Sequence, residues 1–443
     1  MSEFDIVVDS LKSNNVFLTG GAGVGKSYLV KEIIEFYKKD RKNVVALGST
    51  GIAAVNVGGY TVHSFFVFGI SGDFRELKNY DKRNAKRIRD LNKILKRCDL
   101  LVIDEISMIS ADLLDMIYYR LKEAEFDGKI LLVGDFFQLP PVRKKRDEKK
   151  DSLFDFLYAF ESSAWNSLDP LIIELTSPKR ATDREFVNVL KKLRVAECDD
   201  EVIEYLKRLL KKPKDVYKED ATVLFGTNME ASDYNEENLK KLKNPFIELE
   251  SELRIEDESL TQKSVDNWLK NLPVEKDLRL KVDSKVIFTS NKKDLFYNGE
   301  RATVISIEKG VVRVRKEDGV EVDVEPLEYV LSKISYDEKE DSLNEEVLAS
   351  LRQYPLKSAY GITIHKSQGM SIDKLVCNVN NIFAKSQFYV ALSRATDPKN
   401  LGIVYERGNF ERYIKRVVEV SEKVKDFYKN AKILRVEEEE ANG

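Results

Sequence analysis

The chain has 443 residues, of which 42% are hydrophobic and 34% charged, and its formal net charge is −3. This length predicts two or more domains, and no apolar run approaches the ~18 residues of a membrane span. Its three isolated cysteines and two histidines fit neither a disulfide framework nor a zinc site, and its first residues resemble no export or import signal. We therefore expect a globular cytoplasmic protein that does not contact a membrane.

A glycine-rich loop follows the first expected strand, at 16–19. The run Gly20-Gly21-Ala22-Gly23-Val24-Gly25-Lys26-Ser27 matches G-x-x-x-x-G-K-[ST] at every constrained position, and residues with helical periodicity follow it. In such a loop backbone N–H groups surround phosphate oxygens, Lys26 reaches the β and γ phosphates, and the Ser27 hydroxyl ligates Mg²⁺. The loop therefore predicts a site for a nucleoside triphosphate with Mg²⁺.

A second strand, at 44–48, leads into a segment rich in small and hydroxyl residues. Here His63 and the aromatic residues after it offer a surface on which bases can stack. Aromatic residues beside a strand also commonly belong to the core, so both interpretations remain open. The next segment, 75–97, holds ten Lys or Arg against three Asp or Glu, which predicts a charged helical insert with local affinity for polyanions.

Two further buried strands end in polar residues at the edge where parallel sheets bind ligands. The apolar run 100–103 leads into Asp104, which we expect to hold Mg²⁺ through its water shell, and Glu105, which would polarise the attacking water. The strand at 130–134 leads into Gln138 on a proline-rich turn. An amide both donates and accepts hydrogen bonds, so Gln138 is a candidate sensor of the γ-phosphate.

The second half alternates between two kinds of pattern. Apolar strands are expected at 171–175, 221–225, 375–379 and 401–404, with a helix through 388–395 and a terminal helix over 410–434. Between them, short alternating strands separated by Asn-Gly, Lys-Gly and Asp-Gly turns predict a small β-barrel insert. These strands span 285–290, 302–307, 311–314 and 320–324. The charged stretch 335–346 is interpreted as a linker.

Seven motifs in this order resemble those of superfamily 1B DNA helicases of the RecD-like branch, and within it the petite-integration-frequency (PIF-one) helicases. They are residues 20–27, 50–66, 104–107, 134–142, Arg180, 363–369 and 390–395. The resemblance covers essentially the whole chain. It implies an α/β fold of two tandem RecA-like P-loop NTPase lobes, with a small wedge insert in the first lobe and an SH3-like β-barrel insert in the second.

The same resemblance implies domain boundaries and residue roles. Lobe 1A would span 1–68 and 98–175, the wedge (1B) 69–97, lobe 2A 176–280 and 341–443, and the barrel (2B) 281–340. The catalytic set would be Lys26, Asp104, Glu105, Gln138, Arg180 and Arg394. Gln368 and Gly369 would join the glycine-rich loop in binding ATP. The implied DNA-binding residues are Thr50, Gly51, His63, Phe65, Pro140, Thr363, His365 and Lys366.

The resemblance implies an ATP-dependent DNA helicase that translocates 5′ to 3′ on single-stranded DNA and unwinds duplex DNA. Two alternatives stay open: a DNA-stimulated ATPase that translocates without separating strands, and a nucleotide-gated binding module. The expected partners are single-stranded DNA, forked or tailed duplexes and G-quadruplex DNA, bound by a monomer in the cytoplasm at the nucleoid. The chain departs from the family pattern in having no Gln in residues 1–19, where the family reads adenine, and in having Ala181 after Arg180.

Overall fold

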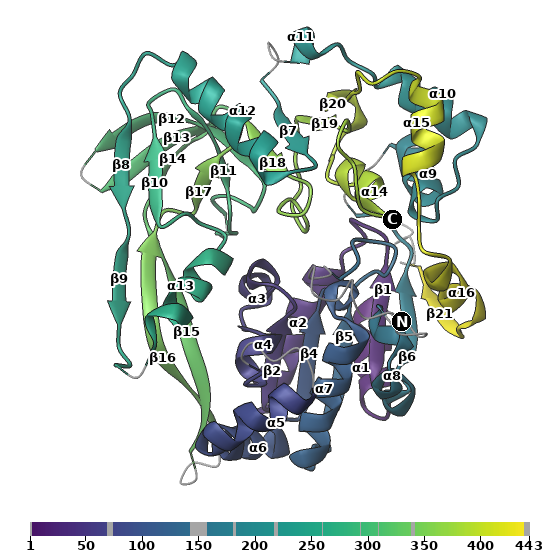
Figure 1. Cartoon of the computed structure of the whole chain (residues 1–443), viewed down its shortest axis with the longest axis vertical. Helices are drawn as coiled ribbons and strands as arrows, with labels where there is room; N and C mark the ends of the chain where they lie inside the picture. The colour runs from purple at the N-terminus through teal and green to yellow at the C-terminus, as the bar shows by residue number, and fades with distance from the viewer. Residues whose placement is uncertain are drawn as a thin grey trace. The chain divides into compact units, whose positions relative to one another are not determined.

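The computed structural model describes residues 2–68, 74–141, 157–179, 183–216, 220–258, 260–292, 294–308, 310–337 and 342–437 (Figure 1). The chain divides into two compact units. Unit 1 comprises Met1–Lys179, Ser332–Glu346 and Glu422–Gly443, and unit 2 comprises Arg180–Leu331 and Val347–Ser421. No helix in the described ranges is both long enough and apolar enough to cross a membrane.

Unit 1 is built on a parallel sheet of seven strands in the order β21-β6-β1-β5-β4-β2-β3. All five strands expected in this region are confirmed, and their bounds differ from the expected ones by at most one residue. A parallel sheet covered on both faces requires such continuous apolar runs. The strands are β1 (Val16–Gly20), β2 (Val44–Gly48), β3 (Tyr60–Thr61), β4 (Leu100–Asp104), β5 (Lys129–Val133), β6 (Leu171–Leu175) and β21 (Ile433–Val436).

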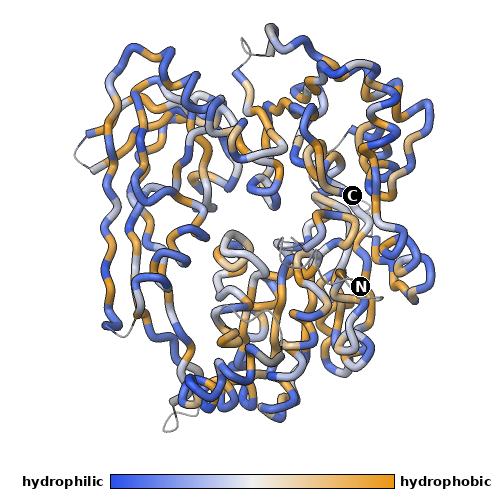
Figure 2. The backbone as a smooth tube through the Cα atoms, viewed as in Figure 1, coloured by the Kyte–Doolittle hydropathy of each residue, from blue (hydrophilic) through white to orange (hydrophobic). Residues whose placement is uncertain are grey.

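Helices surround this sheet, and two of them share one apolar core with it. Val7 and Leu11 of α1 (Glu3–Leu11) and Ile33 of α2 (Lys26–Lys39) pack with Leu18 and Val102 of the strands, and all five side chains are buried. The other helices of unit 1 are α3 (Gly51–Val57), α4 (Val62–Phe65), α5 (Phe74–Arg83), α6 (Ala85–Arg97), η1 (Ile106–Met108), α7 (Ala111–Glu123), η3 (Ala159–Glu161), α8 (Ser163–Leu168) and α16 (Glu422–Asn430). The charged insert is helical, as expected, and mostly hydrophilic (Figure 2).

The C-terminal segment corrects two expectations. The single terminal helix expected over 410–434 is instead α15 (Phe410–Val417), α16 and the strand β21. The last two elements belong to unit 1, although the expected lobe 2A included them, because β21 pairs in parallel with β6. Phe427 of α16 also packs among aromatic rings of unit 1, with centroids 4.5 Å from Phe160 and 5.6 Å from Trp165. A strand this short, whose partner lies some 260 residues away, carries no local signal.

Unit 2 contains a second parallel sheet, of four strands in the order β18-β7-β19-β20. The strands expected at 221–225, 375–379 and 401–404 are confirmed, whereas β18 was not expected. They are β18 (Gly361–Thr363), β7 (Thr222–Phe225), β19 (Leu375–Asn378) and β20 (Leu401–Val404). The helices of unit 2 are α9 (Arg184–Arg194), α10 (Asp200–Arg208), α11 (Pro213–Val216), α12 (Asn228–Lys241), α13 (Gln262–Asn271), α14 (Gln387–Leu392), η4 (Pro398–Asn400) and α15.

The strands expected for the β insert form an antiparallel sheet of five strands in the order β14-β13-β12-β11-β17. All four predicted strands are present, and Val286, Val304 and Val314 are fully buried in its core. The strands are β11 (Lys285–Phe288), β12 (Arg301–Glu308), β13 (Val311–Lys316), β14 (Glu321–Val324) and β17 (Leu356–Ser358).

The linker expected at 335–346 is wrong. Residues 335–337 and 342–346 instead belong to two long strands that pair with each other, β15 (Leu327–Asp337) and β16 (Ser342–Gln353), and residues 338–341 lie outside the described ranges. The low hydrophobicity that indicated a linker reflects the start of β16, where Asn344, Glu345 and Glu346 are exposed. Nearby, β16 pairs with β9 (Glu252–Ile255), and β8 (Ile247–Glu250) pairs with β10 (Asp277–Leu280).

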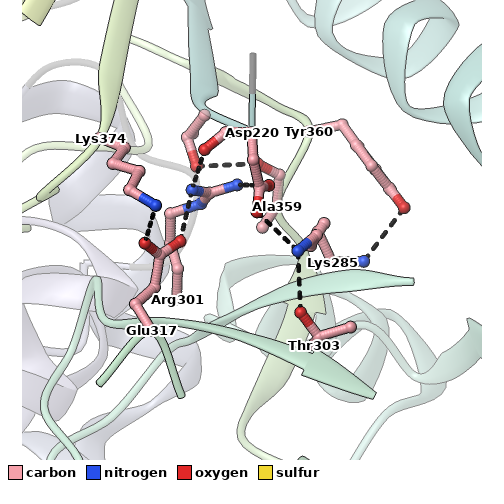
Figure 3. A network of polar contacts seen from close by, with 9 residues as sticks. Asp220, Lys285, Arg301, Thr303, Glu317, Ala359, Tyr360 and Lys374 are labelled. Atoms are coloured by element: carbon pink, nitrogen blue, oxygen red, sulfur yellow. Dashed lines mark hydrogen bonds and ion pairs between the residues drawn. The ribbon is translucent and has the colours of Figure 1, made fainter. Parts of the chain in front are cut away.

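A network of charged side chains joins the four-stranded parallel sheet of unit 2 to its five-stranded antiparallel sheet (Figure 3). The buried Arg301 on β12 donates to the backbone and carboxylate oxygens of Asp220, at 2.6 and 2.9 Å, and to Glu317 at 2.8 Å. Lys285 on β11 also binds Asp220, at 2.6 Å, and Lys374 binds Glu317, at 2.5 Å. Asp220 lies two residues before β7 and Lys374 directly before β19, so the network fixes the antiparallel sheet to the start of the parallel one.

Candidate functional site

The glycine-rich loop lies between β1 and α2, as its motif predicts. Gly23 and Gly25 have φ of +79° and +91°, a conformation that side chains other than glycine adopt only with strain. Gly25 also caps α2 without a side-chain hydrogen bond, so the first N–H groups of the helix face the loop. The Lys26 ammonium donates to the carbonyls of Gly20, at 2.7 Å, and Gly21, at 2.9 Å, which places it over the loop.

The two carboxylates stand at the end of β4. Asp104 is 7% exposed, and burial together with the neighbouring Glu105 raises its pKa, an effect that Lys26 opposes. Glu105 donates its backbone N–H to an Asp104 carboxylate oxygen at 2.8 Å. Its φ of +55° is left-handed, which costs a non-glycine residue about 1–2 kcal/mol. Such strain is concentrated at functional positions, and here it falls on the residue directly after β4.

The expected sensor lies on the loop after β5. The loop leaves the sheet at Gly134, whose N–H donates to Leu18 of β1 at 3.1 Å. Asp135 then accepts the backbone N–H of Gln138 at 2.9 Å, and Gln138 is 6% exposed. Because β1, β5 and β4 are neighbours in the sheet, the loop, the amide and both acids meet at one carboxyl edge.

Tyr428 of α16 is a contact of this site that the sequence did not reveal. Its hydroxyl lies 2.8 Å from the hydroxyl of Thr19, the residue before the glycine-rich loop, and accepts the N–H of Phe136 at 3.4 Å. Its ring stacks on Phe137, with centroids 4.6 Å apart and planes at 20°. A tyrosine 400 residues downstream thus touches the segments that carry Lys26 and Gln138.

Lys179 and Glu3 also lie beside the loop and were missed. Lys179 donates its N–H to the Gly23 carbonyl at 2.8 Å, and its side chain runs past Gly25. Its ammonium lies 3.7 Å from the carboxylate of Glu3, in the first turn of α1. The stretch that lacks glutamine therefore places an acid next to the nucleotide loop. Arg180 and Ala181 lie outside the described residues.

The first segment expected to bind single-stranded DNA lies in unit 1 and contains both exposed and buried residues. Thr50 caps α3, accepting the N–H of Ala53 at 3.2 Å, and α3 begins at Gly51. His63 on α4 is exposed, and Pro140 is half-buried. Phe65 is only 8% exposed and packs on Tyr60 and Phe66, so its expected role in base stacking is not supported and the core interpretation holds.

The second segment expected to bind single-stranded DNA follows β18 in unit 2. Thr363 ends the strand, and its hydroxyl accepts the N–H of Lys366 at 3.3 Å, which fixes a tight turn. This turn leaves Lys366 exposed and His365 half-buried, and burial lowers the pKa of His365. Gln368, 9% exposed, and Gly369, with φ of +80°, end the segment.

Arg394 also belongs to unit 2 and is 2% exposed. Its guanidinium donates to the carbonyl of Val390 at 3.0 Å and to the hydroxyl of Ser393 at 2.8 Å. Within unit 2 it is therefore anchored at the end of α14. The described structure thus groups Lys26, Asp104, Glu105 and Gln138 in one unit and the 363–369 segment with Arg394 in the other.

A glycine-rich loop, two carboxylates and an amide at one edge of a parallel sheet define unit 1 as a P-loop nucleoside triphosphatase. Residues 2–203 match the family model of the PIF1-like helicases, and residues 317–432 match a second model described as helicase. The chain is 40% identical over 448 residues to the ATP-dependent DNA helicase Pif1 of Campylobacter jejuni, with 99% of each chain covered. It therefore belongs to the PIF1-like helicase family, which confirms the resemblance.

Other comparisons agree. The Pif1 helicase of Bdellovibrio bacteriovorus is 32% identical over 95% of this chain and 90% of its own. Among solved structures, Bacteroides sp Pif1 in complex with ADP-AlF4 has a TM-score of 0.82 at 28% identity, covering 97% of this chain and 96% of that one. Candida albicans Pif1 has a TM-score of 0.72 at 29% identity, covering 97% and 99%. The expected α/β fold with two tandem RecA-like lobes is confirmed.

Proposed function

We propose that this chain is an ATP-dependent DNA helicase that moves 5′ to 3′ along single-stranded DNA and separates the duplex ahead of it. The observation that carries the proposal is the meeting of Lys26, Asp104, Glu105 and Gln138 at one sheet edge. They occur in a chain related over nearly its whole length to proteins named ATP-dependent DNA helicases. The polarity comes from the family resemblance alone.

The proposed ATP site is the loop from Gly21 to Ser27, with Gln368 and Gly369 as further contacts. Mg²⁺ fits the donors present, because the exposed Ser27 hydroxyl and the buried Asp104 carboxylate are hard oxygen ligands. When bound, the ion neutralises charge on the β and γ phosphates. In the described part of the chain no cluster of three His, Cys, Asp or Glu forms a metal site, so the ion depends on nucleotide oxygens.

The chain's own groups then act on the phosphates and the attacking water. Lys26 exchanges its two carbonyl partners for phosphate oxygens, while Glu105 orients the water and Gln138 senses the γ-phosphate. Arg394 and Arg180 keep the role implied by the resemblance, as guanidinium donors that stabilise charge on the transferred phosphoryl group.

The residues proposed to contact single-stranded DNA are Thr50, Gly51, His63 and Pro140 in unit 1, and Thr363, His365 and Lys366 in unit 2. One solved relative is Bacteroides Pif1 bound to ssDNA, and another structure concerns forked dsDNA unwound by two coordinating Pif1 helicases. For this chain we propose tailed and forked duplexes and G-quadruplex DNA as substrates, with a single copy sufficient to move on a single strand. Its proposed location is the cytoplasm, at the nucleoid.

The two inserts complete the proposed motor. Helices α5 and α6 would be the wedge that divides the strands, and the five-stranded antiparallel sheet would be the SH3-like 2B domain. The domain boundaries inferred from the sequence are proposed again with three changes: 422–437 joins lobe 1A, 332–346 groups with unit 1, and β17 joins the 2B sheet.

The test compares matched duplexes carrying either a 5′ or a 3′ single-stranded tail, with and without ATP. We expect strand separation only of the 5′-tailed duplex and only with ATP, whereas Lys26→Ala should bind DNA but neither hydrolyse nor unwind. Separation of only the 3′-tailed duplex would overturn the polarity. DNA-stimulated hydrolysis that leaves both duplexes paired would favour a translocase, and hydrolysis that DNA does not stimulate would overturn the motor itself.

A further inference from the structure

Phe383 is an exposed aromatic residue outside every motif used above. It is 69% exposed, and its ring stacks on the imidazole of His365, with centroids 5.7 Å apart and planes at 15°. A single exposed apolar residue is ordinary on a protein surface. An exposed phenyl ring that lies nearly parallel to a half-buried imidazole is a more specific arrangement.

The stacked pair stands at the ligand-binding edge of the sheet in unit 2. His365 follows β18 and Phe383 follows β19, and β7 lies between these two strands in the sheet (Figure 1). All three strands are parallel, so their carboxyl ends open on the same side. The two rings therefore meet over the end of β7, at the edge where open α/β sheets bind their ligands.

The segment that carries Phe383 is held rigidly. The backbone N–H groups of Phe383 and Ala384 both donate to the side-chain oxygen of Gln387, at 2.9 and 3.1 Å, and Gln387 is fully buried. Upstream, Asn381 packs so closely on Gly226 that a Cβ there would lie 2.1 Å from the Asn381 carbonyl oxygen. A fixed ring loses little conformational entropy on binding, which favours its use as a contact surface.

The chemistry around the pair suits a nucleobase. Burial lowers the pKa of His365, so near pH 7 its imidazole is uncharged and stacks as a flat ring. The next residue, Lys366, is exposed and supplies a positive charge for a backbone phosphate. Aromatic faces beside a cation are the elements with which single-stranded nucleic acids are bound without sequence preference.

We propose that Phe383, backed by His365, is a base-stacking platform of unit 2 on which one base of the single-stranded DNA lies. The platform deepens the proposed function and rests on it, because it assigns a stacking contact to the strand on which the motor moves. It adds affinity through a base face, whereas Lys366 adds it through a phosphate. Phe383 thus replaces Phe65, whose ring is buried, as the aromatic contact.

The test measures binding of fluorescein-labelled oligo(dT) at several salt concentrations. Phe383→Ala should weaken binding roughly 5- to 150-fold, the range for loss of one stacked base, with no change in the slope of log Kd against log salt. Lys366→Ala should instead reduce that slope by about 0.7, because a phosphate contact is lost. Phe383→Trp should bind at least as tightly as the wild type, and Phe383→Leu, apolar but without a π face, should behave like Phe383→Ala. Phe246→Ala, which removes another exposed phenylalanine of unit 2, is the control and should bind normally.

Oligonucleotides with one abasic position test the contact directly. At one position along the oligonucleotide, removal of the base should lower the affinity of the wild type. Removal of the base at the same position should not lower the affinity of Phe383→Ala, because the ring that the base contacts is absent. Equal affinity of Phe383→Ala and wild type, or an abasic penalty that persists in the variant, would overturn the platform alone. Failure of the wild type to bind oligo(dT) would overturn the proposed function before the platform.

Discussion

Removal of Asp81 should loosen the insert helices α5 and α6. Asp81 on α5 forms a two-point ion pair with Arg120 of α7, whose Nη1 and Nη2 donate at 2.8 and 2.6 Å. Arg120 is 1% exposed, and its Nε also donates to the Phe66 carbonyl at 3.2 Å. The Asp81→Ala variant would leave a buried guanidinium without its anion.

The size of the effect follows from the burial of each partner. Breaking a fully buried pair from one side costs about 3–5 kcal/mol. The Asp81 side chain is 21% exposed, so water already screens part of the attraction, and we expect about 2–3 kcal/mol. At 1.36 kcal/mol per tenfold change, the opening equilibrium of α5 and α6 should rise roughly 30- to 150-fold.

Hydrogen exchange measured peptide by peptide, together with paired helicase assays, would check this. Exchange should accelerate across α5 and α6 but not in β4 or β5, and strand separation should fall while DNA-stimulated hydrolysis stays within about twofold. Replacing the exposed Asp90 on α6 by Ala is the matched control, and pairing Asp81→Leu with Arg120→Met should recover much of the loss, since both charges are removed. Unchanged exchange in Asp81→Ala would refute the energetic reasoning, and faster exchange with normal unwinding would refute a wedge role.

Three more predictions concern the nucleotide and strand sites. Glu105→Gln should bind ATP normally but hydrolyse it ~10²-fold more slowly, and normal turnover would show that another group activates the water. Tyr428→Phe keeps the ring on Phe137 but loses the contact with Thr19, worth ~1 kcal/mol, so kcat should fall about fivefold with KM little changed. An unaltered kcat would mean that α16 only packs. Because burial lowers the pKa of His365, its imidazole should gain a proton at a lower pH than an exposed histidine does, and the salt slope of DNA binding should stay constant from pH 8 to pH 7. A slope that already steepens between pH 8 and pH 7 would show that His365 gains its proton at a higher pH than burial allows.

Elements with a local physical signal were predictable from the sequence. Strands such as β1 and β4 are buried on both faces, so each is an uninterrupted apolar run, and the residues directly after them carry the chemistry. Lys26, Asp104 and Gln138 could therefore be assigned to one sheet edge before any coordinates were considered. The four strands of the β insert were equally clear, because each alternates and glycine turns separate one strand from the next.

Features that depend on distant partners were not predictable. Tyr428 reaches Thr19 only because β21 extends the sheet beyond β6, and nothing in the sequence around 433–436 indicates that pairing. The burial of Phe65 and Phe383 was equally unpredictable. Both are aromatic residues near a strand, and only their packing shows that the first is buried and the second exposed. A linker was expected at 335–346 because the exposed, charged start of β16, with Glu345 and Glu346, has the composition of a linker.

The return of the chain to its first sheet sets an order for biosynthesis. Until residues 433–436 leave the ribosome, β6 is an open sheet edge, and the aromatic pocket that receives Phe427 is unfilled. Unit 2 is by then complete, because all of its residues precede Glu422. The nucleotide-binding unit is thus begun first and finished last, so a chain interrupted near its end would leave β6 as an open edge with which another chain can pair.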